Sequence, residues 1–216
     1  MIRYLLFDLD DTLYTNTSGL FGEVRQRIEA WLMQALDIPL ETAQTLRREY
    51  HLRYGTTMAG LLHHHPEADV EDYLETVHRV DVTKYLHPAP ELGAMLERLP
   101  AGKVVFTNAI TSWAERILER LEIREHFERI VDVRDVGYLA KPRPEAYEQL
   151  LALLHVDGAD CVLLDDQAPN LQTAAQFGMH TILVRSGQVP SAGVDFAVGT
   201  VLEAEPPLRQ LLNGQV

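Results

Sequence analysis

The sequence predicts an α/β protein in which a parallel sheet is covered by helices on both faces and interrupted once by a helical insertion. Three observations support this fold class. Short β-branched or leucine-rich runs end in polar residues, amphipathic stretches of helical period separate the later runs, and about 70 residues after the first run show helical patterns without a convincing strand. Strands that alternate with helices form βαβ units, whose right-handed crossovers place the strands parallel in one sheet. We therefore expect a Rossmann-like, doubly wound core with an inserted α-helical cap.

Five runs have the length and composition of buried strands, and three amphipathic stretches lie between the later ones. The predicted strands are Tyr4–Asp8, Lys103–Thr107, Ile130–Val133, Cys161–Asp165 and Thr181–Val184. The predicted core helices are Ser112–Leu121, Pro144–His155 and Pro169–Phe177. Proline opens the second and third of these helices, and Gly178 follows the third, as is common at the start and the end of a helix.

The segment between the first two predicted strands is too long to be a simple connection. A βα connection normally takes only a few residues, so this segment must be an insertion with its own structure. Its helical patterns lie at Phe21–Leu36, Leu40–Arg53, Thr56–His64 and Asp69–Val80. We expect residues 15–87 to form a cap over the strand ends, and residues 1–14 and 88–216 to form the core. The linkers are expected near Tyr14–Ser18 and Tyr85–Pro90.

The composition narrows the function classes. The formal net charge of −13 argues against sequence-independent binding to a nucleic acid polymer or an anionic membrane, because both need a basic face. No apolar run reaches the roughly 18 residues of a membrane span, and the apolar stretch near Met1 is too short for a signal peptide. The single cysteine, Cys161, excludes an internal disulfide. A cytoplasmic, reducing location fits these features.

Polar residues stand at the ends of four predicted strands. The first strand ends in Asp8-Leu9-Asp10-Asp11-Thr12, the second in Thr107-Asn108 and the fourth in Asp165-Asp166, whereas Lys141 follows the third. In a doubly wound sheet, ligands bind beyond the carboxyl ends of the strands. We therefore expect these carboxylates, the hydroxyl, the amide and the lysine to meet at one edge of the sheet.

These side chains match what the cleavage of a phosphate ester requires. One carboxylate can attack phosphorus, and a second can protonate the leaving oxygen and then take a proton from water. Two negative charges 4 Å apart repel by roughly 4 kcal/mol at an effective dielectric constant of 20, so positive charge is needed beside the nucleophile and the phosphate. Mg²⁺ held by carboxylates, together with a lysine, would supply it. Thr107 and Asn108 could hold the phosphoryl oxygens through hydroxyl and backbone N–H groups.

Each motif taken alone has a simpler interpretation. The segment from Asp8 to Thr12 could be an acidic turn after a strand, and Asp165-Asp166 could be acids that favour a helix N-terminus. Lys141 could be a surface lysine and Thr107 a helix cap. The occurrence of all four motifs at strand ends, in the order that this chemistry requires, favours the functional interpretation.

Across essentially the whole chain, the sequence resembles the haloacid dehalogenase superfamily of phosphatases. The resemblance is carried by Asp8-Leu9-Asp10-Asp11-Thr12, Phe106-Thr107-Asn108-Ala109, Lys141-Pro142, and Leu164-Asp165-Asp166 with Asn170. It implies a hydrolase that passes through a phospho-aspartate intermediate. It also implies that the helical insertion is the C1 cap of that superfamily.

The resemblance assigns roles to the individual residues of these motifs. It implies that Asp8 is the nucleophile and Asp10 the general acid and base. It implies that Mg²⁺ is bound by the Asp8 carboxylate, the Asp10 backbone carbonyl and Asp166, with Asp165 as an auxiliary ligand, or with Asp165 as the residue that touches the metal. Thr107 and Asn108 would hold the phosphate, and Lys141 would bridge it to the nucleophile.

The choice of substrate depends on a weaker similarity. Three segments are similar to the pyrimidine 5′-nucleotidase-like branch, namely Asp8-Leu9-Asp10-Asp11-Thr12-Leu13-Tyr14, Tyr54-Gly55-Thr56-Thr57 and Phe106-Thr107-Asn108-Ala109. This implies a nucleoside 5′-monophosphate such as UMP or CMP as the small phosphorylated substrate, with Tyr54, Gly55, Thr56 and Thr57 as specificity residues. The turn at Gly55-Thr56-Thr57 could instead only cap the next helix.

Other activities stay open because the motifs at the phosphate do not define the leaving group. A small-metabolite or sugar-phosphate phosphatase and a phosphomutase are the alternatives on the same scaffold. A dehalogenase is disfavoured, because its reaction needs no metal and would not require Asp10 or Asp166. The intact set of Asp8, Asp10, Lys141 and Asp166 also disfavours a non-catalytic binding module.

Overall fold

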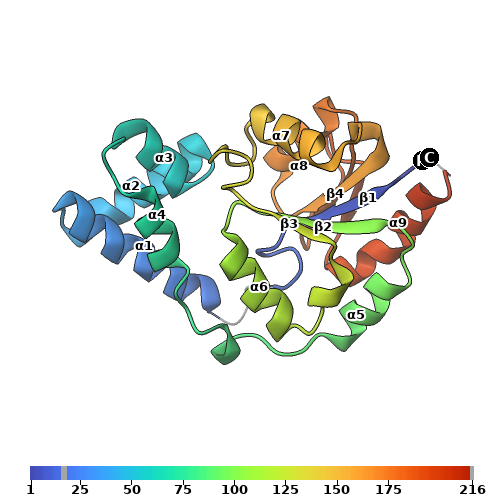
Figure 1. The fold of residues 1–216 in the computed structure, drawn as a ribbon, viewed down its shortest axis with the longest axis horizontal. Coiled ribbons are helices and arrows are strands. Elements are labelled where there is room, and N and C mark those ends of the chain that lie inside the picture. The colour runs from blue at the N-terminus through green and yellow to red at the C-terminus, as the bar shows by residue number, and fades with distance from the viewer. Residues whose placement is uncertain (16–18, 215–216) are drawn as a thin grey trace.

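The fold is a single parallel sheet between two helical layers, with a separate group of helices on one side (Figure 1). It was obtained as a computed structural model, which describes residues 1–15 and 19–214. The strand order is β3-β2-β1-β4-β5-β6, and the neighbouring strands pair in parallel. The strands are β1 Tyr4–Phe7, β2 Gly102–Phe106, β3 Arg129–Val131, β4 Cys161–Asp165, β5 His180–Val184 and β6 Phe196–Val198.

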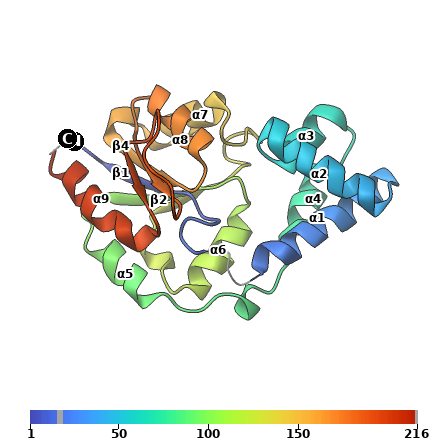
Figure 2. The ribbon, with the colours of Figure 1, turned by 180° about the vertical axis from the view of Figure 1, so that it is seen from behind.

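Alternating side chains of the central strand face two different apolar layers, as expected for a sheet that is covered on both sides. Leu5 and Phe7 of β1 belong to one buried cluster and Leu6 to the other. The first layer contains α5 Pro90–Glu97, α6 Thr111–Arg120 and α9 Glu205–Leu212, and the second contains α7 Pro144–Leu154 and α8 Ala168–Gln176. Figure 2 shows these layers from behind. Short 3₁₀ turns lie at Val82–Lys84, Arg124–His126, Gly158–Asp160 and Val201–Ala204.

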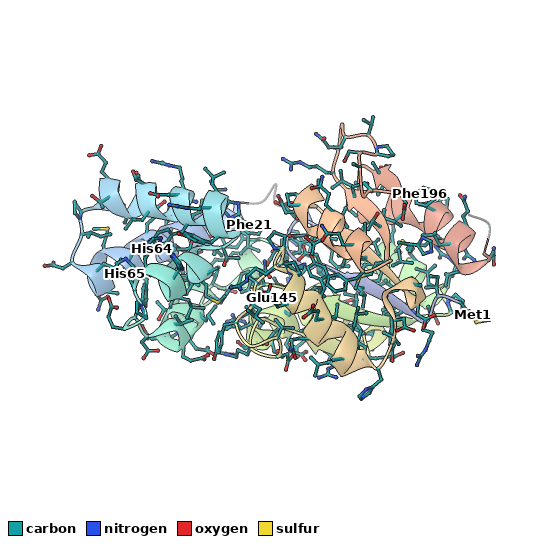
Figure 3. All side chains as sticks on the ribbon, turned by 90° about the horizontal axis from the view of Figure 1, so that it is seen from above. Met1, Phe21, His64, His65, Glu145 and Phe196 are labelled. Atoms are coloured by element: carbon teal, nitrogen blue, oxygen red, sulfur yellow. The ribbon has the colours of Figure 1, made fainter. Side chains whose placement is uncertain are left out.

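The remaining helices form a unit beside the sheet, which we call the helical unit. It consists of α1 Leu20–Leu36, α2 Leu40–Tyr54, α3 Thr57–His64 and α4 Val70–Val77. Trp31 of α1 meets Tyr73 of α4 edge-on, with ring centroids 5.1 Å apart, inside this unit. Figure 3 shows His64 and His65 on the helical unit and Glu145 on the sheet body. The helical unit is inserted between β1 and α5, so the sheet body is formed by the segments before and after it.

The α/β fold class, with a doubly wound parallel sheet and inserted helices, is confirmed. Three elements were not expected from the sequence, namely β6, α5 and α9. The division into 15–87 and the remainder stays a prediction, and residues 16–18 of the first expected linker lie outside the described residues. Among the described residues, no helix combines the length and the hydropathy needed to span a bilayer.

Candidate active site

The carboxyl edge of the sheet brings the first and fourth motifs together. Strands β1 and β4 are neighbours, with Phe7 opposite Leu164 in the register. Asp8, the next residue after β1, donates its backbone N–H to the carbonyl of Leu164 over 2.9 Å. Asp165 ends β4, so the Asp8 and Asp165 side chains emerge side by side, as the sequence predicted. Asp8 and Asp165 are both buried.

Lys141 occupies the centre of this edge although it lies on neither strand. Its ammonium group donates to Asp8 Oδ1 over 2.8 Å, to Asp165 Oδ2 over 2.8 Å and to the backbone carbonyl of Phe106 over 2.7 Å. These three acceptors use all three protons of the ammonium group. Burial alone would lower the pKa of Lys141, but attraction to Asp165 and Asp8 outweighs burial and raises it. Lys141 is therefore a fixed, buried positive charge.

Three carboxylates crowd around this single lysine. Asp8, Asp165 and Asp166 each offer an oxygen, and these oxygens lie within 4.8 Å of one another. Burial raises the pKa of Asp8 well above its ordinary value, and Asp165 and Asp166 add to this effect while Lys141 opposes it. Burial, followed by repulsion from Asp165, raises the pKa of Asp166 to about 7. A hard divalent cation fits this donor set, because it would offset the excess negative charge and prefers carboxylate oxygens.

The two acids of the fourth motif, Asp165 and Asp166, differ in how many hydrogen bonds their carboxylate oxygens accept. Asp165 accepts hydrogen bonds from Lys141 Nζ and from the backbone N–H of Gln167, both over 2.8 Å. Each of its two oxygens also accepts from Asn170 Nδ2 over 2.9 Å. Asp166 is half-buried and accepts a hydrogen bond from the side chain of Gln167. Asp166 is thus the acid with more freedom to meet a ligand, and Asp165 the one that holds the lysine.

The second motif contacts the lysine segment through its amide. Asn108 Nδ2 donates to the carbonyl of Lys141 over 3.0 Å, and Lys141 donates its backbone N–H to Asn108 Oδ1 over 2.7 Å. The hydroxyl of Thr107 accepts from the backbone N–H of Ala109 over 3.0 Å, which leaves its own proton able to donate. Asn108 therefore fixes the segment that carries Lys141, a role that was not expected from the sequence.

Asp10 and Thr12 complete the loop after β1. Thr12 donates its hydroxyl to Asp8 Oδ2 over 3.0 Å, so both oxygens of Asp8 accept a hydrogen bond. Asp10 Oδ1 accepts from the Tyr14 hydroxyl over 2.5 Å and from Trp113 Nε1 over 3.1 Å. Burial raises the pKa of Asp10, and both of these hydrogen bonds oppose the shift. Asp10 was predicted from the sequence, whereas its two partners Tyr14 and Trp113 were not.

The four predicted specificity residues run from the last residue of α2 to the first residue of α3, but they do not all face the same way. Tyr54 shares a 2.6 Å hydrogen bond with His64 Nε2 on the helical unit. Gly55, with a φ of +84°, packs so closely on the sheet body that an added Cβ would lie 3.0 Å from the carbonyl oxygen of Lys141. Thr56 caps α3 by accepting from Ala59 N, and Thr57 is buried. The turn therefore does cap a helix, and it also touches the lysine segment.

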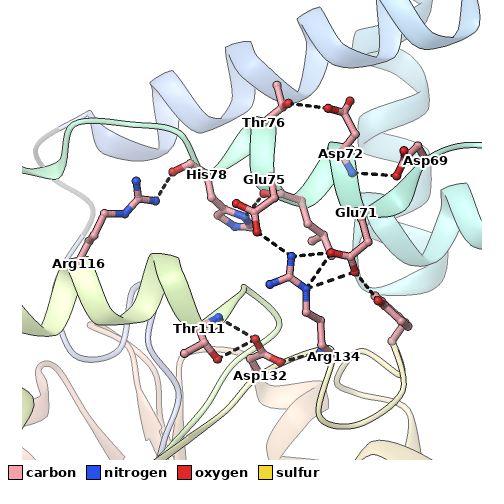
Figure 4. Close-up of polar contacts among 12 residues, drawn as sticks. Asp69, Glu71, Asp72, Glu75, Thr76, His78, Thr111, Arg116, Asp132 and Arg134 are labelled. Atoms are coloured by element: carbon pink, nitrogen blue, oxygen red, sulfur yellow. Dashed lines mark hydrogen bonds and ion pairs between the residues drawn. The ribbon is translucent and has the colours of Figure 1, made fainter.

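A second contact joins the helical unit to the sheet body (Figure 4). Arg134, in the loop after β3, pairs with Glu71 over 2.6 Å and with Glu75 over 2.8 Å, both on α4. Tyr138 donates its hydroxyl to Glu71 as well. Arg116 of α6 donates to the carbonyl of His78, just after α4, over 2.5 Å. These contacts hold α4 beside the sheet.

The fold and this edge define an α/β enzyme whose candidate active site is a group of acids around one buried lysine. Residues 2–178 match the haloacid dehalogenase-like hydrolase family, and the chain belongs to it. The prediction of an enzyme of this hydrolase family is therefore confirmed.

The relatives and solved structures that are similar to this chain are named for several activities. Glyceraldehyde 3-phosphate phosphatase of Pyrococcus abyssi is 28% identical over 212 residues, which cover 87% of this chain and 83% of the relative. Beta-phosphoglucomutase of Bacillus subtilis is 26% identical, over 91% and 89% of the two chains. A HAD phosphatase from Thermococcus onnurineus superposes with a TM-score of 0.64 at 19% identity, covering 99% of each chain. A 2-haloacid dehalogenase from Pseudomonas syringae reaches 0.62 at 21% identity over both whole chains.

These comparisons bear differently on fold and on substrate. The likeness to the two solved structures extends to the fold alone, because their sequence identities are low. The relatives at 26–28% identity are named for sugar-phosphate chemistry. The predicted nucleotidase-like branch is not supported by them, and the sugar-phosphate alternative fits better.

Proposed function

We propose that this protein is a Mg²⁺-dependent phosphomonoester hydrolase that acts on a small phosphorylated metabolite, in the first place a sugar phosphate. The observation that carries the proposal is the buried Lys141 ammonium between Asp8 and Asp165, each 2.8 Å away. This arrangement puts a fixed positive charge beside a carboxylate at the edge of the sheet where ligands bind. It supports attack by that carboxylate on an anionic phosphate.

Asp8 would act as the nucleophile in a reaction of two steps. In the first, an Asp8 oxygen bonds to phosphorus while the ester P–O bond breaks, and the leaving oxygen takes a proton from Asp10 to become an alcohol. In the second, water bonds to phosphorus and gives a proton to the Asp10 carboxylate, while the bond to Asp8 breaks and inorganic phosphate is released. One residue thus serves first as acid and then as base.

The carboxylates of Asp8 and Asp166, with the backbone carbonyl of Asp10, would hold Mg²⁺. Asp165 would serve as an auxiliary residue, since its oxygens already accept from Lys141, Asn170 and Gln167. When bound, the cation would neutralise charge on the phosphate and the nucleophile. The raised pKa of Asp166 and the crowding of three carboxylates support a cation at this point.

The Thr107-Asn108 pair would bind the phosphate. Lys141, whose three protons already go to Asp8, Asp165 and the Phe106 carbonyl, would contribute to phosphate binding through its positive charge. The Thr107 hydroxyl has a proton to donate to a phosphoryl oxygen, because it acts as an acceptor in its contact with Ala109. The Asn108 side chain is already bonded twice to the backbone of Lys141, so it would align the lysine, and the backbone at Asn108 would contact the phosphate.

Residues 15–87 would act as a C1-type cap that selects the leaving group. The close approach of Gly55 to Lys141 and Pro142 supports this role, because it brings the turn between α2 and α3 to the edge of the candidate site. Gly55 would then face the substrate pocket from the cap side. Tyr54, Thr56 and Thr57, which are bonded or buried within the helical unit, would act on specificity by fixing the position of this turn. A nucleoside monophosphate is the second candidate substrate, favoured only by the sequence similarity at Tyr54–Thr57.

The test is a phosphate-release assay over glyceraldehyde 3-phosphate, hexose phosphates, UMP and CMP, with Mg²⁺ and with EDTA. We expect Mg²⁺-dependent release that is fastest with a sugar phosphate, complete loss in EDTA, and recovery when Mg²⁺ is returned. Faster turnover of UMP or CMP would favour a nucleotidase. Transfer of phosphate between sugar positions without net release would identify a phosphomutase, and halide release from a 2-haloacid without metal would overturn the proposal.

A further inference from the structure

Asp10 is held by two donors that converge on a single oxygen. The Tyr14 hydroxyl donates to Oδ1 over 2.5 Å and Trp113 Nε1 donates to the same atom over 3.1 Å. The two donors come from different parts of the chain, because Tyr14 lies four residues after Asp10 whereas Trp113 lies on α6. Together they fix the plane and the rotation of the Asp10 carboxyl group.

The chemistry of the indole decides which oxygen can carry the proton. An indole N–H is a donor only, so the oxygen that it meets must offer a lone pair. Among the described residues, Asp10 Oδ2 has no hydrogen-bond partner. When Asp10 is protonated, the proton therefore belongs on Oδ2, where it is free to be passed on.

Trp113 is itself fixed from several sides. Its side chain is 1% exposed, and its indole meets the His78 ring with centroids 5.3 Å apart. The Arg116 guanidinium lies 5.6 Å from the indole centroid and donates to the carbonyl of His78. Figure 4 shows this contact between Arg116 and His78. The indole N–H consequently points at Asp10 from a rigid position and not from a mobile side chain.

We propose that Tyr14 and Trp113 are positioning residues that fix Asp10 with Oδ2 as the oxygen that gives and takes the proton. The inference rests on the proposed function, because it assigns these roles within a phosphate-ester hydrolysis. A positioned acid matters most when the leaving group is a poor one, such as an alkoxide from a sugar phosphate. It matters least for p-nitrophenyl phosphate, whose leaving group departs as a stable anion.

The experiment compares Tyr14→Phe and Trp113→Phe with the native enzyme on a sugar phosphate and on p-nitrophenyl phosphate. The value of kcat/KM reports steps up to phosphorylation of Asp8, where Asp10 acts as acid. We expect kcat/KM to fall by about 10- to 100-fold for the sugar phosphate, within the range of general acid catalysis. For p-nitrophenyl phosphate we expect a change of less than about threefold on the same grounds.

Matched controls remove the same groups at other carboxylates. Trp31 Nε1 donates to Asp72 over 2.7 Å, and the Tyr85 hydroxyl donates to Glu23 over 2.6 Å. Trp31→Phe and Tyr85→Phe should leave the ratio of kcat/KM for the two esters as in the native enzyme. Thermal unfolding of all four variants establishes that they are folded. If Trp113→Phe does not fold, Tyr14→Phe still decides, because it removes a single oxygen atom.

The outcomes separate this inference from the function on which it rests. Equal losses on the two esters in folded Tyr14→Phe and Trp113→Phe, or no loss on either, would show that the two residues only pack around the loop. A native enzyme without activity on either ester would instead overturn the proposed function.

Discussion

Two ion clusters of similar geometry lie in very different surroundings. In the buried cluster, Lys141 Nζ lies 2.8 Å from Asp8 and 2.8 Å from Asp165. In the cluster between α4 and the sheet body, Arg134 lies 2.6 Å from Glu71 and 2.8 Å from Glu75. The side chains of the first are between 0% and 11% exposed, whereas those of the second are 30% to 50% exposed.

Distance alone therefore does not determine what an ion pair does. At 4 Å, two unit charges interact by about 1 kcal/mol in water but by about 4 kcal/mol at an effective dielectric constant of 20. In the proposed function the buried cluster acts on chemistry, because little water reaches it to weaken its charges when a phosphate is bound there. The exposed cluster acts on the placement of the helical unit, through contacts that water and salt weaken.

The largest expected effect is that of Asp8→Asn. The amide keeps the shape of the side chain but cannot form the phospho-enzyme, so we expect turnover of the preferred substrate to fall by about 10⁴-fold or more. Stability should not fall with it, because the change removes one of three crowded negative charges. Steady-state phosphate release and urea unfolding check both parts. Activity close to native would exclude Asp8 as the nucleophile.

A smaller but combined effect is expected for Lys141→Met. It strands the Asp8 and Asp165 carboxylates in a buried place, which costs about 3–5 kcal/mol of unfolding free energy, and activity should be lost as well. Lys103→Met is the matched control, because Lys103 is also buried but its ammonium group donates to the backbone carbonyls of Leu99 and Ala101. That variant should keep its activity.

The Lys141→Met variant should also respond to pH. The pKa of Asp8 is already raised in the folded protein, and loss of the lysine should raise it further. A carboxyl with a raised folded-state pKa favours the folded state less as pH rises through that value. The stability deficit should therefore shrink as pH falls from neutral. Urea midpoints measured over a pH series would show a constant deficit if no carboxylate were stranded.

The strand-end part of the site could be predicted from sequence because it follows from local runs and one topological rule. Asp8 and Thr107 directly follow apolar strands, Asp165 ends one, and parallel strands present their carboxyl ends at one edge. Lys141 could be placed there only through its motif, because it lies in a loop. Strand β6 was missed because its three residues are all half-buried and show no alternation of apolar and polar side chains.

Contacts across the fold could not be predicted in the same way. Trp113 meets Asp10 only because α6 packs beside the loop after β1, and the pair is separated by 103 positions. The prediction of a nucleotide substrate was not supported, for a related reason. The motifs at the phosphate are shared by enzymes with different leaving groups, so they could not separate a nucleotide from a sugar phosphate.

The smallest expected effect is that of Arg134→Gln, which tests the exposed half of the comparison. A double-mutant cycle with Glu75→Gln should give a coupling energy below about 1 kcal/mol, as is usual for exposed ion pairs. Raising the salt to about 1 M shortens the Debye length to roughly 3 Å, so the coupling should become smaller still. Urea unfolding of the four proteins at low and high salt measures it. A coupling energy of about 3 kcal/mol that does not change with salt would contradict this expectation, because the exposed cluster would then behave like the buried one.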